Sequence, residues 1–340
     1  MRASIRSPSG NARWTLQAVL LGLAACAAAL SPARAEDLDV IQYNVQFVAP
    51  WDFSRASPSH YPNTEERARA IGQALACYDI VALNETINDR RRRQILAAME
   101  AAAAACGKPS RFGGGNSFQL LAGPSLPPAA QGWPSLAALA AFARSDVPMA
   151  VTDDEVAIVT RLPVIASGSH IFGSARGTDA LTAKGVLHAR LGRSGAARPG
   201  DAIEVFVTHL QANHAEIRRS QIAELAAFVA TRAEPGLPAL LLGDFNIDGA
   251  AAARADPQGE YRNMMRHLAP LGFRDLGLAL GGTDSWERRR IDYIFLRGEG
   301  LQARDARVET FGELPFDALS DHAAVTAALR WTRALAPTPP

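Results

Sequence analysis

The feature that most constrains the fold of this chain is a series of short apolar runs, most of which end in an Asn, Asp, Glu or His. Each run has the length of a buried β-strand, about 4–8 residues, and is too short for a long core helix. We therefore interpret these runs as buried strands. The predicted strands cover Leu38–Tyr43, Ile80–Leu83, Glu155–Val159, Val186–Leu191, Ile203–Val207, Ala239–Leu242, Ile291–Leu296 and Ala323–Leu329.

Amphipathic segments between several of these runs predict helices. Thr64 is suited to cap one helix, because Glu65 and Glu66 follow it in the first turn. A second helix is expected over about Asn88–Cys106, and a third from near His214 onward. Strands and helices alternate at the start of the chain and hairpin-like strand runs follow, which favours an α/β fold with a mixed sheet or sheets.

The N-terminus has the pattern of an export signal. Three arginines precede the apolar run Trp14–Leu30, and Ala33–Ala35 offers the small residues of a cleavage site. This pattern predicts a secretory signal peptide over residues 1–35 and a periplasmic or secreted protein. The alternative is a lipoprotein, since Leu23–Cys26 is similar to a lipobox that would leave a lipid on its cysteine. No other stretch is long and apolar enough to span a bilayer.

Export would change both the charge and the redox environment of the mature chain. The full chain has 35 Lys and Arg against 34 Asp and Glu, and four of the arginines lie in residues 1–35, which leaves 31 against 34, or −3. Cys77 and Cys106 would lie in an oxidising compartment near the ends of two predicted helices, where they could form a disulfide. Two buried thiols are the alternative, and no CxxC or Cys/His cluster supports metal binding.

The mature chain is expected to be one domain over residues 36–332, because no linker divides two complete alternating patterns. Residues 110–148 break the strand and helix pattern with several glycines and prolines. They predict a long loop insertion with one short helix near Ser135–Ala143. The Pro-rich residues 333–340 are expected to form a frayed tail.

The polar residues that end the apolar runs are the candidates for chemistry. Strand ends that meet at one rim would bring these groups together. Oxygen donors without a thiolate favour a hard cation such as Mg²⁺, and Glu85 with Asn44 could bind it.

Two histidines among these residues are candidates for proton transfer. His209 and His322 could supply a base and an acid near neutral pH, and Asp321 or Asp292 could orient one of them. No P-loop and no GxSxG motif is present. The set therefore favours metal-assisted attack of water on a phosphoester.

Six motifs follow one another in the order Asn44, Glu85, Thr208–Leu210, Gly243–Asn246, Arg290–Tyr293 and Ser320–His322. Together they resemble the endonuclease/exonuclease/phosphatase superfamily, and Glu155–Pro163 is similar to an internal strand of that family. The resemblance covers nearly the whole mature chain. It implies a four-layer α/β sandwich of the deoxyribonuclease-I-like type, with two mixed β-sheets flanked by helices. It also implies hydrolysis of a phosphodiester with Mg²⁺ as cofactor, or with Mn²⁺ or Co²⁺.

The resemblance assigns a metal site and a base. Glu85 and Asn44 are expected to be the metal ligands. His322 is expected to be the general base that activates water. Asp321 sits beside this base and is expected to help bind the metal.

The resemblance also assigns residues to the phosphate. Asp244 and Asn246 would contact it or orient the nucleophile. His209 would stabilise charge on the phosphoryl oxygens or assist the leaving group. Asp292 would orient a catalytic group without contacting the phosphate itself, although it could instead pair with Arg288 or Arg290.

Several details are similar to the sphingomyelinase C-like branch of the superfamily. They are the Thr208–Ala212 strand motif, Asn84 before the metal-binding Glu, the Lys184–Val186 element and the helix after Ser59–Pro62. This branch implies release of phosphocholine from sphingomyelin. A phospholipid at a membrane surface is therefore the expected substrate.

Charge and aromatic residues bear on the same choice of substrate. A nonspecific nuclease benefits from a basic surface, which a net charge of −3 does not supply, so nucleic acid is the weaker expectation. An exported nuclease or inositol-phosphate phosphatase of the same fold is the alternative, followed by a non-catalytic binding or toxin-like module. We expect a monomer. Aromatic residues in predicted loops could enter a lipid interface, namely Trp51, Phe53, Tyr61, Phe118 and Trp133.

Overall fold

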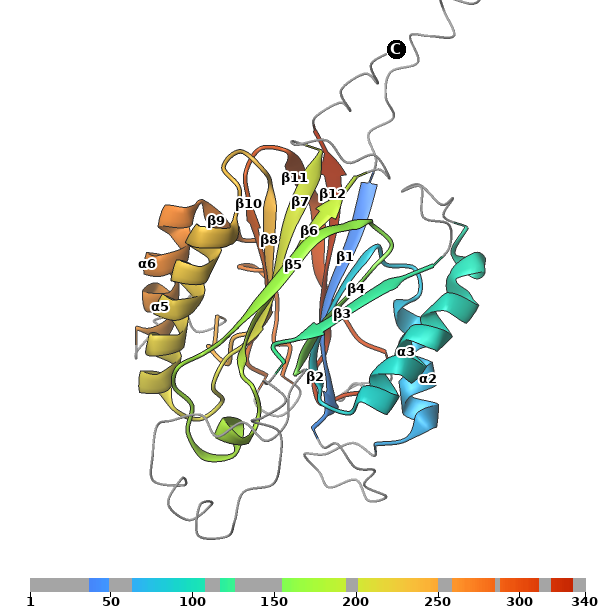
Figure 1. Ribbon diagram of the computed structural model, residues 1–340, viewed down its shortest axis with the longest axis horizontal. Helices are drawn as coiled ribbons and strands as arrows, with labels where there is room; N and C mark the ends of the chain where they lie inside the picture. Colours follow the sequence, from blue (N-terminus) through green and yellow to red (C-terminus); the bar gives the residue numbers. More distant parts are fainter. Residues whose placement is uncertain are drawn as a thin grey trace, which may run out of the picture. The chain divides into compact units, whose positions relative to one another are not determined.

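The computed structural model describes residues 37–48, 63–107, 117–125, 155–193, 201–249, 259–284, 288–311 and 319–332. Two six-stranded sheets pack face to face, and helices cover the outer face of each (Figure 1). The expected four-layer α/β sandwich is confirmed.

The two sheets share one plan. The strands are β1 (Asp37–Phe47), β2 (Ile80–Thr86), β3 (Gln119–Gly123), β4 (Val156–Thr160), β5 (Val164–Ile171), β6 (Gly185–Gly192), β7 (Ala202–His209), β8 (Ala239–Asp244), β9 (Phe273–Asp275), β10 (Asp292–Arg297), β11 (Leu301–Glu309) and β12 (Ala324–Trp331). The first sheet has the order β11-β12-β1-β2-β4-β3 and the second the order β5-β6-β7-β8-β10-β9. Each contains one parallel pair, β1–β2 or β7–β8, among antiparallel neighbours, so both sheets are mixed.

The α-helices in the described part of the chain are α2 (Glu65–Leu75), α3 (Asp89–Ala102), α5 (Ala215–Arg232) and α6 (Glu260–Leu268). The first two begin at a polar side chain that caps the helix. Thr64 caps α2, as its sequence predicted, by accepting a hydrogen bond from the Arg67 N–H at 3.2 Å. Asn88 caps α3 by accepting one from the Arg91 N–H at 3.1 Å. The helical turn after α3 ends at Gly107, whose φ of 61° favours glycine.

Alternation of side chains along the strands divides the apolar residues into a central core and two outer cores. On β1, Leu38 and Val40 pack between the two sheets, whereas Ile41 and Tyr43 pack against the layer of α2 and α3. The outer face of the second sheet packs in the same way against α5 and α6. Both faces of these strands are thus buried, which explains why they are continuous apolar runs.

Several elements differ from the sequence expectations. Strand β3 pairs with β4 and lies inside residues 110–148, so the prediction of a loop is wrong for this part of the insertion. Phe118 is not an exposed loop aromatic, because the residue is 6% exposed and its ring centroid lies 4.6 Å from the Arg161 guanidinium carbon. Strands β5 and β11 and helix α6 are absent from the sequence expectations. In the two strands, several exposed residues interrupt the apolar pattern.

Other expectations fall on residues outside the described ranges. These are the signal peptide and lipobox, the short helix near Ser135–Ala143, the C-terminal tail, and the aromatic residues Trp51, Phe53, Tyr61 and Trp133. They stay predictions. Among the described residues, none of the helices has the length and apolar character needed to cross a membrane.

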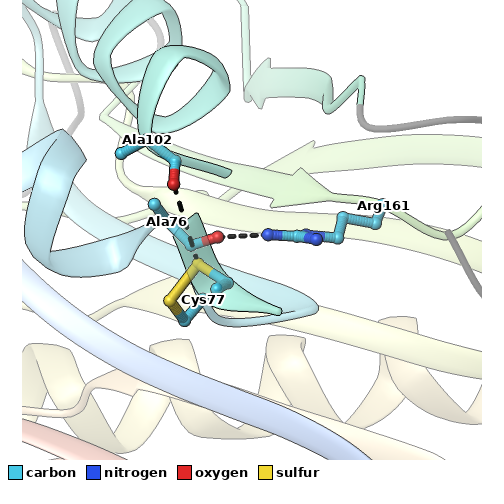
Figure 2. The surroundings of a disulfide bond; sticks show 5 residues. Ala76, Cys77, Ala102 and Arg161 are labelled. Atoms are coloured by element: carbon cyan, nitrogen blue, oxygen red, sulfur yellow. Dashed lines mark hydrogen bonds between the residues drawn. A yellow bond between two sulfur atoms is a disulfide. The ribbon is translucent and has the colours of Figure 1, made fainter. Parts of the chain in front are cut away.

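The disulfide that the sequence left open is present between Cys77 and Cys106 (Figure 2). It joins the turn after α2 to the turn after α3, across a sequence separation of 29. Beside it, the carbonyl of Ala76 accepts a hydrogen bond from the Arg161 guanidinium (Figure 2). The two helices that cover the first sheet are therefore cross-linked at their C-terminal ends.

Candidate active site

The polar side chains of the site continue the inner faces of the sheets beyond the core. On β1, Gln42 and Asn44 follow Leu38 and Val40 on the same face, because side chains alternate along a strand. Strand β10 runs antiparallel to β8, and its first residue pairs with the last residue of β8. One end of the sandwich therefore gathers polar groups from both sheets. The other strands contribute Asn84 of β2, His209 of β7, Asp244 of β8 and Asp292 of β10.

Hydrogen bonds between the two sheets close the site. Asn44 Nδ2 donates to Glu85 Oε1 at 3.0 Å within its own sheet and to Asp244 Oδ2 at 3.1 Å on the opposite sheet. Asn84 Nδ2 donates to the Thr208 carbonyl at 3.0 Å, and Asn84 Oδ1 accepts from the Asp244 N–H at 3.0 Å. The amide of Asn44 is therefore shared by two carboxylates, Glu85 and Asp244, that come from different sheets.

Three residues of the site adopt a left-handed backbone that non-glycine residues rarely take. They are Gln46 (φ 48°), Glu85 (φ 57°) and Asn246 (φ 53°). Gly243 is required for a different reason, since a Cβ there would lie 2.0 Å from the Thr208 carbonyl oxygen of the neighbouring strand. Backbone strain of this kind persists where surrounding contacts hold it, as at functional sites.

His322 is held by a buried carboxylate. Its Nδ1 lies 2.7 Å from Asp292 Oδ2, and its Nε2 lies 3.8 Å from Asp244 Oδ2. Gln42 Nε2 donates to Asp292 Oδ1 at 3.2 Å, and the Asp292 N–H donates to Thr283 Oγ1 at 3.2 Å. The imidazole is thereby fixed with Nε2 directed at the carboxylate cluster.

His209 approaches the same Asp244 carboxylate from the second sheet. Its Nε2 lies 3.6 Å from Asp244 Oδ2 and 3.2 Å from Asn246 Nδ2. Its Nδ1 lies 2.8 Å from Glu155 Oε1, which also accepts a hydrogen bond from Lys184 Nζ at 3.1 Å. Glu155 and Lys184 are both buried, so His209 faces a charge pair sheltered from solvent.

This charge pair sets the protonation of His209. Burial alone would raise the pKa of Glu155, but the Lys184 and His209 cations lower that pKa to about 2. Burial and Lys184 both act to lower the pKa of His209, but Glu155 and Asp244 outweigh them and raise it. An ionised Glu155 therefore favours a positively charged His209.

Carboxylates dominate the surroundings of His322. Burial would lower the pKa of His322, yet Asp292, Asp244 and Asp321 together raise that pKa well above its usual value. Burial, aided by Glu85 and opposed by His322, raises the pKa of Asp321 to about 7. In the absence of a bound cation, this side of the site accordingly attracts protons.

The donor atoms suit a divalent cation. Glu85, His209 and Asp244 each offer one ligand atom, and these atoms lie within 4.8 Å of one another. The same is true of Asp244, Asp292 and His322, so Asp244 belongs to both groups. Carboxylate oxygens without a thiolate favour a hard cation such as Mg²⁺ or Mn²⁺. The residues present therefore fit the expected metal.

Most of the site residues expected from sequence meet in one connected cluster. Asp321 lies beside the cluster, where its Oδ2 accepts a hydrogen bond from Gln46 Nε2 at 2.6 Å. The Asn44 side chain directs its nitrogen at the carboxylates, and its oxygen accepts from the Gln46 N–H at 3.1 Å. Metal binding by these two residues stays a prediction. The connected cluster contains Asn44, Glu85, His209, Asp244, Asn246, Asp292 and His322.

Sequence reasoning missed the residues that support the cluster. Gln42, Asn44 and Gln46 are every second residue of one strand. Side chains at this spacing point to the same face of a sheet, and this spacing is the sequence signal that predicts their proximity. Glu155 directly precedes β4, and its sequence context predicts only a strand. Lys184 belongs to an element similar to one of the family, but the sequence does not predict its contact with Glu155.

Fold and site together define a class of protein, the two-sheet α/β sandwich with a cluster of carboxylates and histidines at one end. The chain belongs to the Endonuclease/Exonuclease/phosphatase family, whose model matches residues 41–322. No curated protein matches the sequence.

Solved structures with this fold carry different activities in their names. Beta toxin from Staphylococcus aureus, in a mutant with bound magnesium ions, is 20% identical, with 86% of this chain and 99% of that one covered and a TM-score of 0.57. Sphingomyelinase C from Streptomyces griseocarneus is 19% identical, with 86% and 99% covered and a TM-score of 0.56. TDP2 from D. rerio, complexed with a single-strand DNA product, is 16% identical, with 86% and 99% covered and a TM-score of 0.56. At such identities the likeness establishes the fold.

Proposed function

We propose that this protein is an exported, metal-dependent phosphodiesterase that hydrolyses the headgroup ester of a phospholipid, with sphingomyelin as the leading substrate. The observation that carries the proposal is the His322–Asp292 pair, with 2.7 Å between His322 Nδ1 and Asp292 Oδ2. Because Nδ1 is occupied, Nε2 is the atom left to take a proton from water. His322 is therefore the general base of the proposed reaction.

The phosphate would lie between the two histidines. His209 keeps a positive charge beside Glu155, and its Nε2 faces Asp244 and Asn246. A charged imidazole and an amide at this position would stabilise negative charge on the phosphoryl oxygens or assist the leaving group. Asp244, which lies within 4 Å of both histidines, would orient the attacking water.

Glu85 and Asp244 would hold the divalent cation, with Asn44 and Asp321 as the further predicted ligands. When bound, Mg²⁺ neutralises phosphate charge and polarises the phosphoryl group. Neutralising Asp244 would also lower the pKa of His322, because Asp244 is one of the carboxylates that raise it. This change favours the unprotonated imidazole, which is the form that can act as a base.

Three observations support a phospholipid over a nucleic acid. The chain without residues 1–35 has a net charge of −3, and phosphate contacts by basic residues drive nucleic-acid affinity. The sequence resembles the sphingomyelinase C-like branch at the Thr208–Ala212 and Lys184–Val186 motifs. Two of the similar structures are a sphingomyelinase C and a beta toxin, although a DNA-bound protein has nearly the same similarity. Export rests on the N-terminal pattern alone.

The test is a parallel assay of the chain without residues 1–35. Sphingomyelin vesicles, phosphatidylcholine vesicles, plasmid DNA and inositol phosphates are each offered with Mg²⁺ and with a chelator. We expect phosphocholine release from sphingomyelin that needs Mg²⁺ and is lost in His322→Ala. His267→Ala, at the end of α6, is the matched control and should behave as wild type.

Each other outcome has a defined meaning. Plasmid nicking that His322→Ala abolishes, with intact vesicles, would replace the lipid proposal by a nuclease. Hydrolysis of inositol phosphates alone would indicate a phosphatase. Absence of turnover on every substrate would contradict the enzymatic proposal.

A further inference from the structure

Arg67, in the first turn of α2, is a buried arginine that contacts two separate segments of the proposed active site. One guanidinium nitrogen donates to the Val45 carbonyl at 2.6 Å and to the Leu319 carbonyl at 2.8 Å. The other donates to the Gln46 carbonyl at 2.9 Å. One side chain thus joins the end of β1 to the segment that leads into β12, although these segments are far apart in the sequence.

The two segments carry residues on which the proposed reaction depends. The end of β1 carries Asn44, and Leu319 directly precedes Ser320, Asp321 and His322. Two further contacts join the same segments, since Ser320 Oγ donates to the Asn44 carbonyl at 2.6 Å and the His322 N–H donates to Ser320 Oγ at 3.3 Å. The position of His322 relative to Asn44 is therefore set by a small group of polar contacts, with Arg67 at its centre.

Arginine is suited to this place because its planar guanidinium directs several donors at once. Its terminal carbon lies 3.8 Å above the Phe47 ring, which fixes the plane of the group. The base of the side chain is equally fixed, because Thr64 caps the helix at this residue and Ala68 and Ile71 are buried. A lysine would offer one ammonium, and a methionine no donor at all.

We propose that Arg67 is a positioning residue that aligns His322 with the carboxylate cluster. The inference rests on the proposed function, since alignment matters for turnover only if His322 is the base. Arg67 touches neither the substrate nor the metal ligands in this account, and acts through backbone carbonyls. Misplacement of a reacting group by about 1 Å can cost on the order of 10²-fold in rate. Loss of Arg67 should accordingly lower kcat and leave KM nearly unchanged.

A second buried arginine provides a matched control. Arg161 also donates to a backbone carbonyl, that of Ala76 (Figure 2). Its guanidinium also lies over an aromatic ring, that of Phe118. Its own N–H donates to the carbonyl of Asp79, which directly precedes β2. Glu85 lies at the other end of this strand. Arg161→Met should therefore destabilise the fold in the same manner as Arg67→Met without moving the site.

The experiment compares Arg67→Met, Arg67→Lys and Arg161→Met in the full mature chain with Mg²⁺. We expect Arg67→Met to lower kcat per folded molecule by about 10²-fold. Arg67→Lys should recover part of the loss, and Arg161→Met should keep the wild-type kcat. Equal kcat values for Arg67→Met and wild type, or equal losses in Arg67→Met and Arg161→Met, would overturn the proposal.

Amide hydrogen exchange supplies a readout that does not depend on turnover. Arg67→Lys should exchange faster than wild type in peptides that cover residues 44–48 and 319–324, with unchanged exchange in β7 and β8. Unchanged exchange in both segments would overturn the proposal. If Arg67→Met does not fold, Arg67→Lys tests the proposal through the same two measurements, kcat per folded molecule and amide hydrogen exchange. If the wild type turns over no substrate, the proposed function fails and the exchange result alone judges the positioning role.

Discussion

His322, which lies just before β12, and His209, the last residue of β7, approach the same Asp244 carboxylate but differ in the surroundings of their other carboxylate partner. Each has Nδ1 within 3 Å of a buried carboxylate, Asp292 or Glu155, and each has Nε2 within 4 Å of Asp244. The other oxygen of Asp292 accepts from the neutral amide of Gln42. The same Glu155 oxygen that faces His209 also accepts from the Lys184 ammonium.

Of the two histidines, His322 is the stronger base. Within the described part of the chain, Asp292 forms an ion pair only with His322, whereas Glu155 faces both His209 and Lys184. The pKa of His322 is accordingly raised well above its usual value. The pKa of His209 is also raised, but there burial and Lys184 oppose the effect of Glu155 and Asp244. His322 is thus suited to take a proton, and His209 to remain a fixed positive charge in a salt-bridge network.

Removal of the base should have the largest effect. His322→Ala should lower kcat by about 10²–10⁴-fold, because a positioned base contributes about that much to the rate. The measurement is kcat at saturating substrate, with a thermal unfolding curve to show that the variant is folded. A variant that keeps most of the wild-type kcat would contradict the assignment of His322.

Removal of the Asp292 charge, which holds His322, should have the second-largest effect on kcat. Asp292→Asn keeps the shape of the side chain, removes its charge, and should lower kcat on the order of 10²-fold. Because Asp292 raises the pKa of His322, the variant should have a lower pKa at this histidine, and the acidic limb of its kcat profile should move to lower pH. A limb that stays in place would show that Asp292 does not set the charge of His322.

Removal of the carboxylate charge beside His209 should affect the stability of the fold more than turnover. Glu155→Gln leaves Lys184 buried beside a neutral amide and should lower the free energy of unfolding by about 3 kcal/mol, with a fall in kcat of about tenfold. Since the folded-state pKa of Glu155 is about 2 against 4.5, its contribution should be complete above pH 4.5 and lost as the pH falls towards 2.

Urea unfolding of the metal-free protein across this pH range measures the contribution. The wild type and Glu155→Gln should converge in acid. A constant difference between them at every pH would contradict the ion pair.

Loss of the disulfide should have the smallest effect on the two histidines. Cys77 and Cys106 lie in the turns after α2 and α3, away from both carboxylate pairs. The double variant Cys77→Ser/Cys106→Ser should lose roughly 3 kcal/mol of unfolding free energy, because a closed loop of this length restricts the unfolded chain. Its kcat should equal that of the wild type when measured well below the unfolding temperature. A large fall in kcat would show that the helical layer also positions the site.

The fold was largely predictable because its central strands are buried on both faces. Runs such as Ile203–Val207 and Ala239–Leu242 are continuous apolar stretches, and polar groups mark their ends. Strands β3 and β5 escaped prediction because they lie at sheet edges, where partly exposed residues interrupt the pattern.

The site was predictable only in part. The residues of the carboxylate and histidine cluster lie in recognisable motifs, whereas the residues that hold them in place are identified only by their contacts in the folded chain. Asp244 and His322 belong to motifs that can be read locally. Gln46 and Arg67 act through contacts with residues more than two hundred positions away, Asp321 and Leu319. Such contacts exist only after the chain has folded, and no local sequence spacing predicts them.

The most direct test of the difference between the two histidines is the pH dependence of kcat in His209→Ala, measured with Mg²⁺ on the substrate identified in the parallel assay. If His322 is the base, the variant is slower than wild type at every pH. Its rate still falls in acid, because His322 becomes protonated there. Disappearance of this acidic limb in His209→Ala would show that His209 is the base instead, and would contradict the account.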